Sequence, residues 1–221
     1  MRIEKALNLP EPAVLAVVGC GGKSSLIKLL AMSFPGKKVL ISPTTKMFPI
    51  NINNADCVGQ LNSKTGKLEA LPPEKLTELI QGYDISLLEA DGSRGLPLKG
   101  WLHNEPVVPG YCTHTIGVAT INPLGKKLAA EIVFNLPQFL KLTGLCEGEK
   151  ITCDALHKMI CAPGGMFKNS AGSRVLLINQ VESGIVANRA ESFLQKIKQN
   201  YPGFFEKILY GSVFYNAWTE I

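Results

Sequence analysis

The sequence predicts an α/β protein with a mostly parallel sheet, helices on both faces of the sheet and a helical insertion. Short apolar runs alternate along the chain with segments of helical periodicity, which is the pattern of β-α-β units. The runs are apolar at nearly every position, as expected for strands with both faces buried. With 221 residues, of which 46% are apolar, the chain can bury a sizeable core, and we expect one domain over residues 1–221.

The expected elements follow one another regularly along the chain. Six apolar runs are expected to be strands, at residues 13–18, 38–42, 85–88, 115–120, 175–178 and 207–210. Helical spacing is found at residues 26–34, 74–80 and 186–197. Residues 49–72 are rich in Asn, Gly and Pro, which predicts a loop or a small hairpin. Further helical spacing within residues 129–161 predicts the insertion, around residues 125–170.

A glycine-rich loop joins the first strand to the first long helix. It reads Gly19-x-x-Gly22-Lys23-Ser24, a short form of the phosphate-binding motif found in Mur-type ligases; the long form would need glycine in place of Val17. Backbone N–H groups of such a loop and the positive end of the helix dipole bind phosphates. We therefore expect a P-loop NTPase-like fold that binds ATP or GTP through a loop of seven residues: Gly19, Cys20, Gly21, Gly22, Lys23, Ser24 and Ser25.

Within this loop, Lys23 is expected to reach the β- and γ-phosphate oxygens, and the Ser24 hydroxyl is expected to ligate Mg²⁺. A plain glycine-rich turn with a solvated lysine is the alternative. The strand and helix signals on the two sides of the loop favour phosphate binding.

Two carboxylates follow the strand expected at residues 85–88. Glu89 and Asp91 are two positions apart, so both side chains can face the same side. An acid at the end of such a strand is where P-loop enzymes hold Mg²⁺, directly or through water. We expect Glu89 and Asp91 to hold the metal and to orient the attacking group; the alternative is a simple Asp-Gly turn.

Polar residues also end the strand expected at residues 38–42. Ligands of open α/β sheets bind along the carboxyl ends of the strands. Thr44 or Thr45 is a candidate to supply a hydroxyl to Mg²⁺, with Thr45 preferred, and Lys46 is a candidate second cation for catalysis. A Thr-rich strand end with a solvated lysine fits the same residues equally well.

Residues near the end of the strand at 175–178 are candidates for contact with the base. Asn179-Gln180-Val181-Glu182 is similar to the Asn-Lys-x-Asp element of GTPases, but Gln replaces Lys and Glu replaces Asp. Asn179 and Glu182 are therefore candidate base contacts, and the pattern leaves the base open. A strand-end Asn turn is the alternative.

The loop after Asp91 carries charged residues between prolines and glycines. Arg94, Lys99 and Glu105 are candidate contacts for a second substrate, because such a loop lies directly after the carboxylate strand.

Composition narrows the possible partners. The net charge of +5 comes without a basic-aromatic stripe, which favours a small anionic ligand over nucleic acid. The chain has no apolar stretch of transmembrane length and no signal-peptide core, so we expect no membrane association and a cytoplasmic location. Six cysteines without a C-x-x-C pair predict neither zinc nor disulfides, and Cys20 is the one thiol expected to be chemically distinctive.

Several segments together resemble a known family. GCGGKSS, SPTTKMF, LLEADGSRGLPLKG, NEPVVPG, GGMFKNS and VLLINQVE occur here in the order seen in selenium-dependent molybdenum hydroxylase accessory proteins, the YqeC type. The resemblance runs from about Val14 to Glu182. It implies a nucleotide-binding protein that helps to mature a selenium-containing molybdenum hydroxylase. It also implies contact with that enzyme and with a selenium or molybdopterin species. The family's motifs fall on Gly19, Gly22, Lys23, Ser24, Thr44, Thr45, Lys46, Glu89, Asp91, Arg94, Lys99, Glu105 and Lys168.

The expected activity is therefore that of a Mg²⁺-dependent NTPase or an NTP-driven transferase. Two alternatives stay open: an ATP-dependent ligase that uses the short loop, and a chaperone gated by nucleotide without turnover. Turnover with water alone, turnover only with a carboxylate and an amine, and binding without turnover would separate the three.

Overall fold

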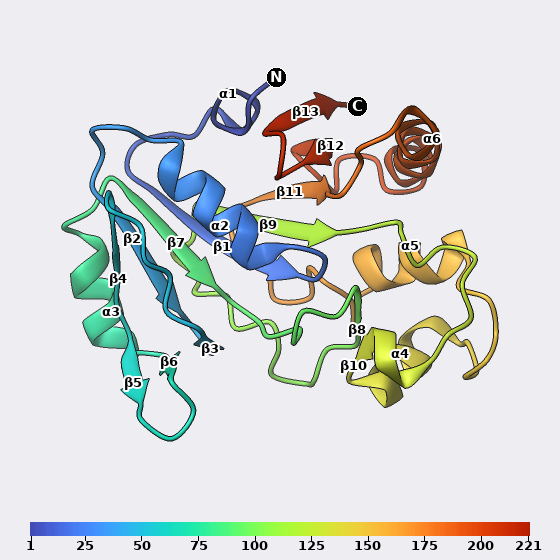
Figure 1. Cartoon of the computed structure of the whole chain (residues 1–221), viewed down its shortest axis with the longest axis horizontal. Helices are drawn as coiled ribbons and strands as arrows, with labels where there is room; N and C mark the ends of the chain where they lie inside the picture. The colour runs from blue at the N-terminus through green and yellow to red at the C-terminus, as the bar shows by residue number, and fades with distance from the viewer.

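An eight-stranded sheet forms the centre of the computed structural model, which describes residues 1–221 (Figure 1). Its strand order is β13-β12-β11-β9-β1-β7-β2-β4. The strands are β1 (Ala13–Gly19), β2 (Val39–Pro43), β4 (Ala55–Cys57), β7 (Ile85–Glu89), β9 (His114–Ala119), β11 (Ser173–Ile178), β12 (Lys207–Ser212) and β13 (Ala217–Glu220). All pairs are parallel except β12 with β13. The expected α/β class with a mostly parallel sheet is confirmed.

The connections place the carboxyl end of β1 at the point where the chain changes direction across the sheet. From β1 the chain runs to β2 and returns to β7, then crosses to β9 and continues to β11 and β12. Open α/β sheets bind ligands at such a switch point. The register sets Val17 opposite Glu89 and Gly19 opposite Val118, so the loop after β1 emerges between the ends of β7 and β9.

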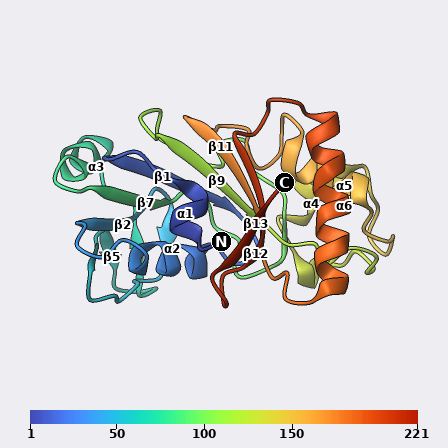
Figure 2. The same ribbon diagram turned by 90° about the horizontal axis from the view of Figure 1, so that it is seen from above.

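Alternate residues of β1 point into two cores, one on each face of the sheet. Leu15 and Val17 belong to the core under α1 (Ile3–Leu7) and α2 (Lys23–Met32). Ala16 and Val18 belong to the larger core on the other face. That face is covered by α3 (Pro73–Ile80), α4 (Leu136–Thr143), α5 (Cys153–Cys161) and α6 (Gly184–Asn200). Figure 2 shows α1 and α2 on one side of the strands and α5 and α6 on the other.

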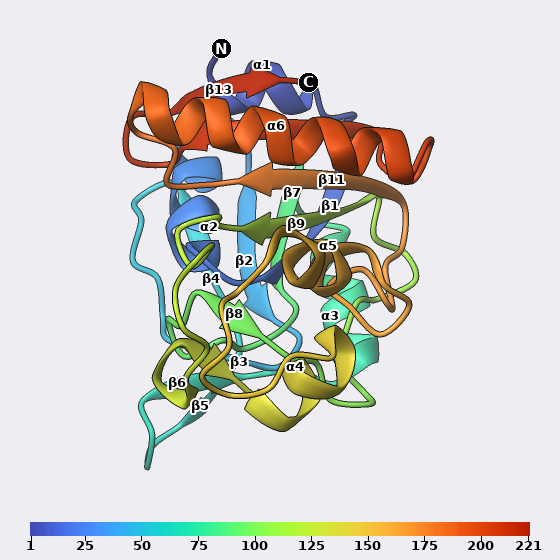
Figure 3. The same ribbon diagram turned by 90° about the vertical axis from the view of Figure 1, so that its right-hand side faces the viewer.

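The segment between β9 and β11 contains the expected insertion. It comprises η1 (Ala130–Ile132), β10 (Val133–Phe134), α4 and α5, and β10 pairs with β8 (Leu98–Lys99). Figure 3 shows α4 and α5, below α6 in that view. Phe134 therefore belongs to a strand, although its spacing suggested a helix. The helix begins only at Leu136, because Asn135 has a positive φ of 57° and Pro137 lies in the first turn.

The expected hairpin excursion lies at one edge of the main sheet. Strands β3 (Lys46–Met47), β5 (Gln60–Asn62) and β6 (Lys67–Glu69) form a small antiparallel sheet, while β4 joins the main one. Among the helices, none combines the length and the apolar character needed to cross a membrane.

Candidate functional site

The glycine loop has a backbone that only glycine adopts easily. Gly19, Gly21 and Gly22 have φ values of 98°, 89° and 127°. A Cβ on Gly22 would lie 2.5 Å from Nδ2 of Asn179, and one on Gly19 would lie 2.3 Å from the carbonyl oxygen of Val118. Neighbouring atoms therefore leave no room for a side chain at Gly19 or Gly22. The loop leads into the first turn of α2, where backbone N–H groups have no partner within the helix.

A cavity of about 730 Å³ opens over this loop. That volume is in the range of small-molecule sites. Five basic side chains line it, against two acidic ones: Lys23, Lys28, Lys46, Lys67 and Arg94 against Glu89 and Glu105. The other lining residues include Gly21, Gly22, Ser24, Ser25, Thr45, Phe48, Ser93, Phe134 and Gln180. The excess of positive charge favours an anionic ligand.

Ser24 and Glu89 meet at the wall of the cavity. The Ser24 hydroxyl on the first turn of α2 donates a hydrogen bond to Oε2 of Glu89 at the end of β7, at 3.3 Å. Burial raises the pKa of Glu89 above its usual range, and the nearby Lys23 ammonium offsets only part of that effect. A partly desolvated carboxylate beside a hydroxyl is a suitable environment for a hard cation.

Lys23 is almost completely buried by its own loop. Its Nζ donates to the carbonyl oxygen of Gly19 at 2.6 Å and to Oγ of Ser93 at 3.3 Å, and it lies 3.1 Å from Oδ1 of Asp91. Burial works to lower its pKa, but the carboxylates of Asp91 and Glu89 outweigh burial, and the pKa is raised. Lys23 therefore stays charged, and it is one of the residues that line the cavity.

Asp91 lies behind the loop and does not line the cavity. We expected it to face the ligand beside Glu89, but it is fully buried. Its oxygens accept the Gly19 N–H at 3.1 and 3.2 Å and the Trp101 Nε1–H at 2.7 Å, and they contact Lys23 and Lys99. The strand ends at Glu89, so the alternation that would have put both acids on one side no longer holds.

Lys99 was expected to contact a second substrate, yet it is fully buried and absent from the cavity wall. Its Nζ lies 3.5 Å from Oδ2 of Asp91 and 3.1 Å from Oε2 of Glu105, and it donates to the carbonyl oxygen of Gly92. The other two residues expected at this site, Arg94 and Glu105, do line the cavity. The guanidinium of Arg94 lies 5.1 Å from the centre of the Phe134 ring.

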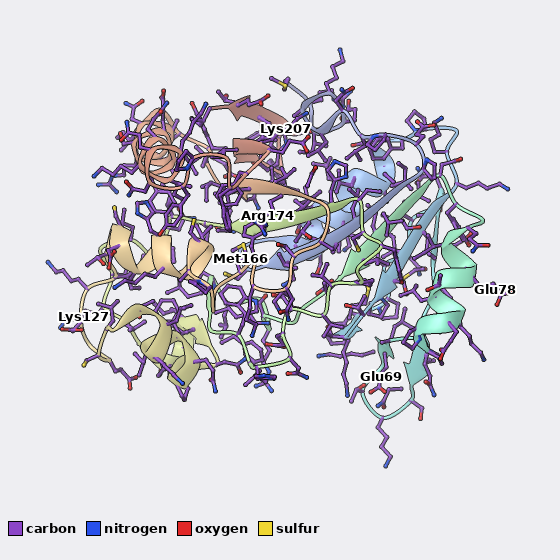
Figure 4. The ribbon with its side chains drawn as sticks, turned by 180° about the vertical axis from the view of Figure 1, so that it is seen from behind. Glu69, Glu78, Lys127, Met166, Arg174 and Lys207 are labelled. Atoms are coloured by element: carbon purple, nitrogen blue, oxygen red, sulfur yellow. The ribbon has the colours of Figure 1, made fainter.

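Thr45 and Lys46 both lie at the cavity, after the end of β2. The Thr45 hydroxyl oxygen is buried and has no hydrogen-bond partner. Lys46 is exposed and pairs with Glu69 of β6 at 2.9 Å; Figure 4 shows Glu69 at the small hairpin. Thr44, in contrast, donates to the carbonyl oxygen of Val107 at 2.6 Å. The unpartnered hydroxyl makes Thr45 the better candidate ligand of the two.

Asn179 supports the loop with both ends of its amide. Nδ2 donates to the carbonyl oxygen of Gly21, and Oδ1 accepts the Val213 N–H, each at 2.9 Å. Glu182 accepts a hydrogen bond from the Ser212 hydroxyl at 2.9 Å and is otherwise exposed. The structure thus brings Asn179 to the glycine loop, whereas Glu182 does not line the cavity.

The thiol of Cys20 is not the reactive group that its place in the loop suggested. It is fully buried and donates to the carbonyl oxygen of Pro97 at 3.1 Å. Burial is the main reason that its pKa is raised to about 12. Its backbone remains part of the loop, and its side chain fills the core beneath it.

The oxygen-bearing residues of the cavity suit Mg²⁺, which needs few protein ligands, better than a metal ion that takes all its ligands from the protein. Ser24, Glu89 and Thr45 all line the cavity and carry side-chain oxygens, and one of these, the Thr45 hydroxyl, is buried without a partner. The chain has no group of three or more His, Cys, Asp or Glu side chains that could hold a metal ion. Mg²⁺ is commonly held by one or two carboxylates, with water and substrate phosphates as its other ligands.

Several residues of the site were missed in the sequence, among them Ser93, Trp101, Phe134, Lys28 and Lys67. Ser93 contacts Lys23, Trp101 binds Asp91, and Phe134 forms a wall of the cavity. Ser93 and Trp101 lie in the charged loop after β7, where only the charged residues were considered. Phe134 lies more than 100 positions after the glycine loop, in the insertion, and no local pattern connects it with that loop.

Fold and site together define an α/β protein with a glycine-rich strand-to-helix loop at the mouth of a basic cavity. Over residues 15–137 the chain matches the family model described as YqeC protein. It is 33% identical over 215 residues to a curated protein of Escherichia coli (strain K12) described as "Uncharacterized protein YqeC". That match covers 86% of this chain and 84% of the relative. The chain belongs to the YqeC family.

Proposed function

We propose that this protein binds a nucleoside triphosphate together with Mg²⁺ through the loop Gly19–Ser25 and hydrolyses it or uses it to drive a transfer. The observation that carries the proposal is the hydrogen bond between Ser24 and Glu89 at the mouth of the glycine loop. A loop hydroxyl and a carboxylate from the neighbouring strand end are the pair that holds Mg²⁺ in P-loop enzymes.

Phosphate binding is supported by the loop itself. The positive φ values open the backbone toward the cavity, and the start of α2 adds the positive end of its dipole. Lys23 has three N–H donors, and its weakest contact is that with Ser93 at 3.3 Å. A phosphate oxygen can replace that hydroxyl without loss of the contacts to Gly19 and Asp91.

Ser24, Glu89 and Thr45 would hold the Mg²⁺, which when bound neutralises charge on the phosphate oxygens. Glu89, close to that position, also serves to orient the attacking group. Lys46 and Arg94 add positive charge at the outer part of the cavity. Asn179 supports the loop, and Glu182 is the candidate for contact with the base.

We further propose, from the resemblance alone, that the activity helps to mature a selenium-dependent molybdenum hydroxylase. Arg94 and Glu105 then contact the second substrate, a selenium or molybdopterin species. A gene deletion in the native host tests this role. Full activity of the hydroxylase, with selenium still incorporated, would refute it.

Titration calorimetry with ATP and GTP, each with and without Mg²⁺, tests nucleotide binding directly. Lys23→Ala should weaken binding by about 2 kcal/mol, roughly 30-fold, because a charged hydrogen-bond donor is lost. Ser24→Ala should remove the effect of Mg²⁺. Ser33→Ala at the other end of α2 is the matched control, since its hydroxyl donates to the carbonyl oxygen of Leu29.

Three results would count against the proposal. Unchanged affinity in folded Lys23→Ala protein would refute triphosphate binding by this loop. Tight binding by the wild type with no turnover would favour the nucleotide-gated chaperone, and turnover only with a carboxylate and an amine would favour the ligase.

A further inference from the structure

Asp91 collects hydrogen-bond donors from three separate segments. They are the Gly19 N–H and Lys23 Nζ of the glycine loop, Lys99 Nζ of β8, and Trp101 Nε1 just after it. Asp91, Lys99 and Lys23 have at most 4% of their surface exposed. One buried carboxylate is thus held both by the glycine loop and by the segment at residues 99–101.

Positive and negative side chains alternate along the series from Lys23 to Glu105. Lys23 contacts Asp91, Asp91 contacts Lys99, and Lys99 contacts Glu105, at 3.1, 3.5 and 3.1 Å. Two cations face two carboxylates, and Glu105 at the far end lines the cavity. Such buried charges are expensive to desolvate, and apolar residues of similar volume are often at least as stabilising. Stability alone is therefore a poor reason to place four charges here.

The two groups that Asp91 holds in the loop are the ones that matter for phosphates. The contact to Gly19 fixes the backbone where the loop begins, and the contact to Lys23 fixes the ammonium of a residue that lines the cavity. The shortest bond to Asp91 comes from the Trp101 indole, at 2.7 Å. The Trp101 bond and the Lys99 contact both involve Oδ2 of Asp91. Together they set the orientation of the carboxylate, which could rotate if only the glycine loop held it.

We propose that Lys99 and Trp101 are positioning residues of the phosphate loop, which act through Asp91 on Gly19 and Lys23. The proposal rests on the proposed function. It makes Lys99 part of the support of the loop instead of a contact to the second substrate.

Trp101→Phe tests the proposal, because it removes the indole N–H and keeps an aromatic ring. The second tryptophan supplies the control: Trp218 is also buried, but its Nε1 has no hydrogen-bond partner. Lys99→Met is the second variant, with Lys158→Met as its control, because Lys158 forms an exposed pair with Asp154. Each variant is compared with the wild type at a temperature where circular dichroism shows it fully folded.

Two readouts are needed. Hydrogen exchange of a peptide over residues 17–25, measured without nucleotide, should be faster in Trp101→Phe and Lys99→Met only. The Kd for the Mg²⁺ complex of ATP or GTP, whichever the wild type binds, should rise about fivefold to tenfold in the same two variants, the loss expected for one hydrogen bond. Affinity and exchange in both control variants should match the wild type.

Equal affinity in Trp101→Phe and Trp218→Phe would overturn the proposal, even if the loop exchanges faster. A loss of affinity without faster exchange would also overturn it, because the effect would not pass through the loop. Failure of the wild type to bind either nucleotide refutes the proposed function instead. The exchange experiment still decides, in that case, whether Trp101 and Lys99 hold the loop.

Discussion

The amide of Asn179 donates a hydrogen bond to the carbonyl oxygen of Gly21, across 158 positions of the chain, at 2.9 Å. The same side chain accepts the N–H of Val213, in the turn after β12. The glycine loop is thereby tied to the far half of the sheet. A side chain proposed to recognise the base thus already has both polar atoms engaged with the protein.

Replacement of Asn179 by Ala should weaken nucleotide binding about fivefold, about 1 kcal/mol, because one hydrogen bond that orders the loop is lost. Calorimetry measures the change. Asn54→Ala is the control, since Asn54 also donates to a backbone carbonyl, that of Ala31, which lies outside the glycine loop. Equal losses in both variants would mean that Asn179 has no special connection with the site.

Gly22→Ala should abolish nucleotide binding and destabilise the fold by about 1–3 kcal/mol. The new Cβ would lie 2.5 Å from Nδ2 of Asn179, at a residue with φ of 127°. Gly36→Ala separates the two causes, because Gly36 also has a positive φ, of 80°, but has open space around it. Urea unfolding should show a smaller loss for Gly36→Ala, about 1–2 kcal/mol, with binding retained.

Glu89→Gln should raise the stability of the nucleotide-free protein near neutral pH. The folded-state pKa of Glu89 is raised by burial, so folding favours the protonated form, and its contribution to stability is lost as pH rises through that pKa. A neutral amide removes this penalty. The same variant should bind nucleotide without any effect of Mg²⁺.

Thermal unfolding with and without Mg²⁺ and nucleotide checks both parts of the prediction for Glu89. Glu78→Gln on the exposed side of α3, labelled in Figure 4, should change neither quantity. A less stable Glu89→Gln protein would contradict the assigned pKa direction.

Acidification should destabilise the protein through two buried histidines. Burial lowers the pKa values of His114 and His157 below their usual 6.5. A lowered pKa means that the unfolded chain binds protons more readily, so stability is lost as pH falls through 6.5 and below. Urea unfolding at pH 7.5 and at about pH 5 measures the loss, and a His114→Gln, His157→Gln double variant should show less of it.

Thiol reagents should modify Cys146 first and Cys20 last. Cys146 is exposed, whereas burial raises the pKa of Cys20 to about 12. Cys112 and Cys161 are also buried, and burial raises their pKa values to about 12 as well. Mass spectrometry after brief alkylation locates the labelled thiols, and early labelling of Cys20 would show that the loop opens.

The sheet could be predicted because its strands are buried on both faces. The strands around Leu40 and Leu87 are buried at every position. Such mostly apolar runs are typical of parallel strands that helices cover on both faces. The edge strand β13 was missed because Trp218 is its only buried residue. Helix α1 was missed because five residues are too few for a periodic pattern to be recognised.

The residues that line the cavity at the glycine loop could be predicted, and the buried residues that support the loop could not. Ser24 and Glu89 belong to motifs whose spacing fixes their place at strand and helix ends. The burial of Asp91 and Lys99 depends on where β7 stops and how the following loop folds back through Trp101, a tertiary arrangement that spacing does not encode.

The paired charges of Asp91, Lys99 and Glu105 also restrict which substitutions this protein can accept during evolution. A lineage that loses the charge at position 91 or 99 leaves an opposite charge buried and unpaired, which is strongly destabilising. Positions 91, 99 and 105 should therefore be kept or exchanged as a set among descendants, with paired replacements more frequent than single ones. Arg94, exposed at the cavity wall, is not part of this buried group, so its replacement alone leaves no buried charge unpaired.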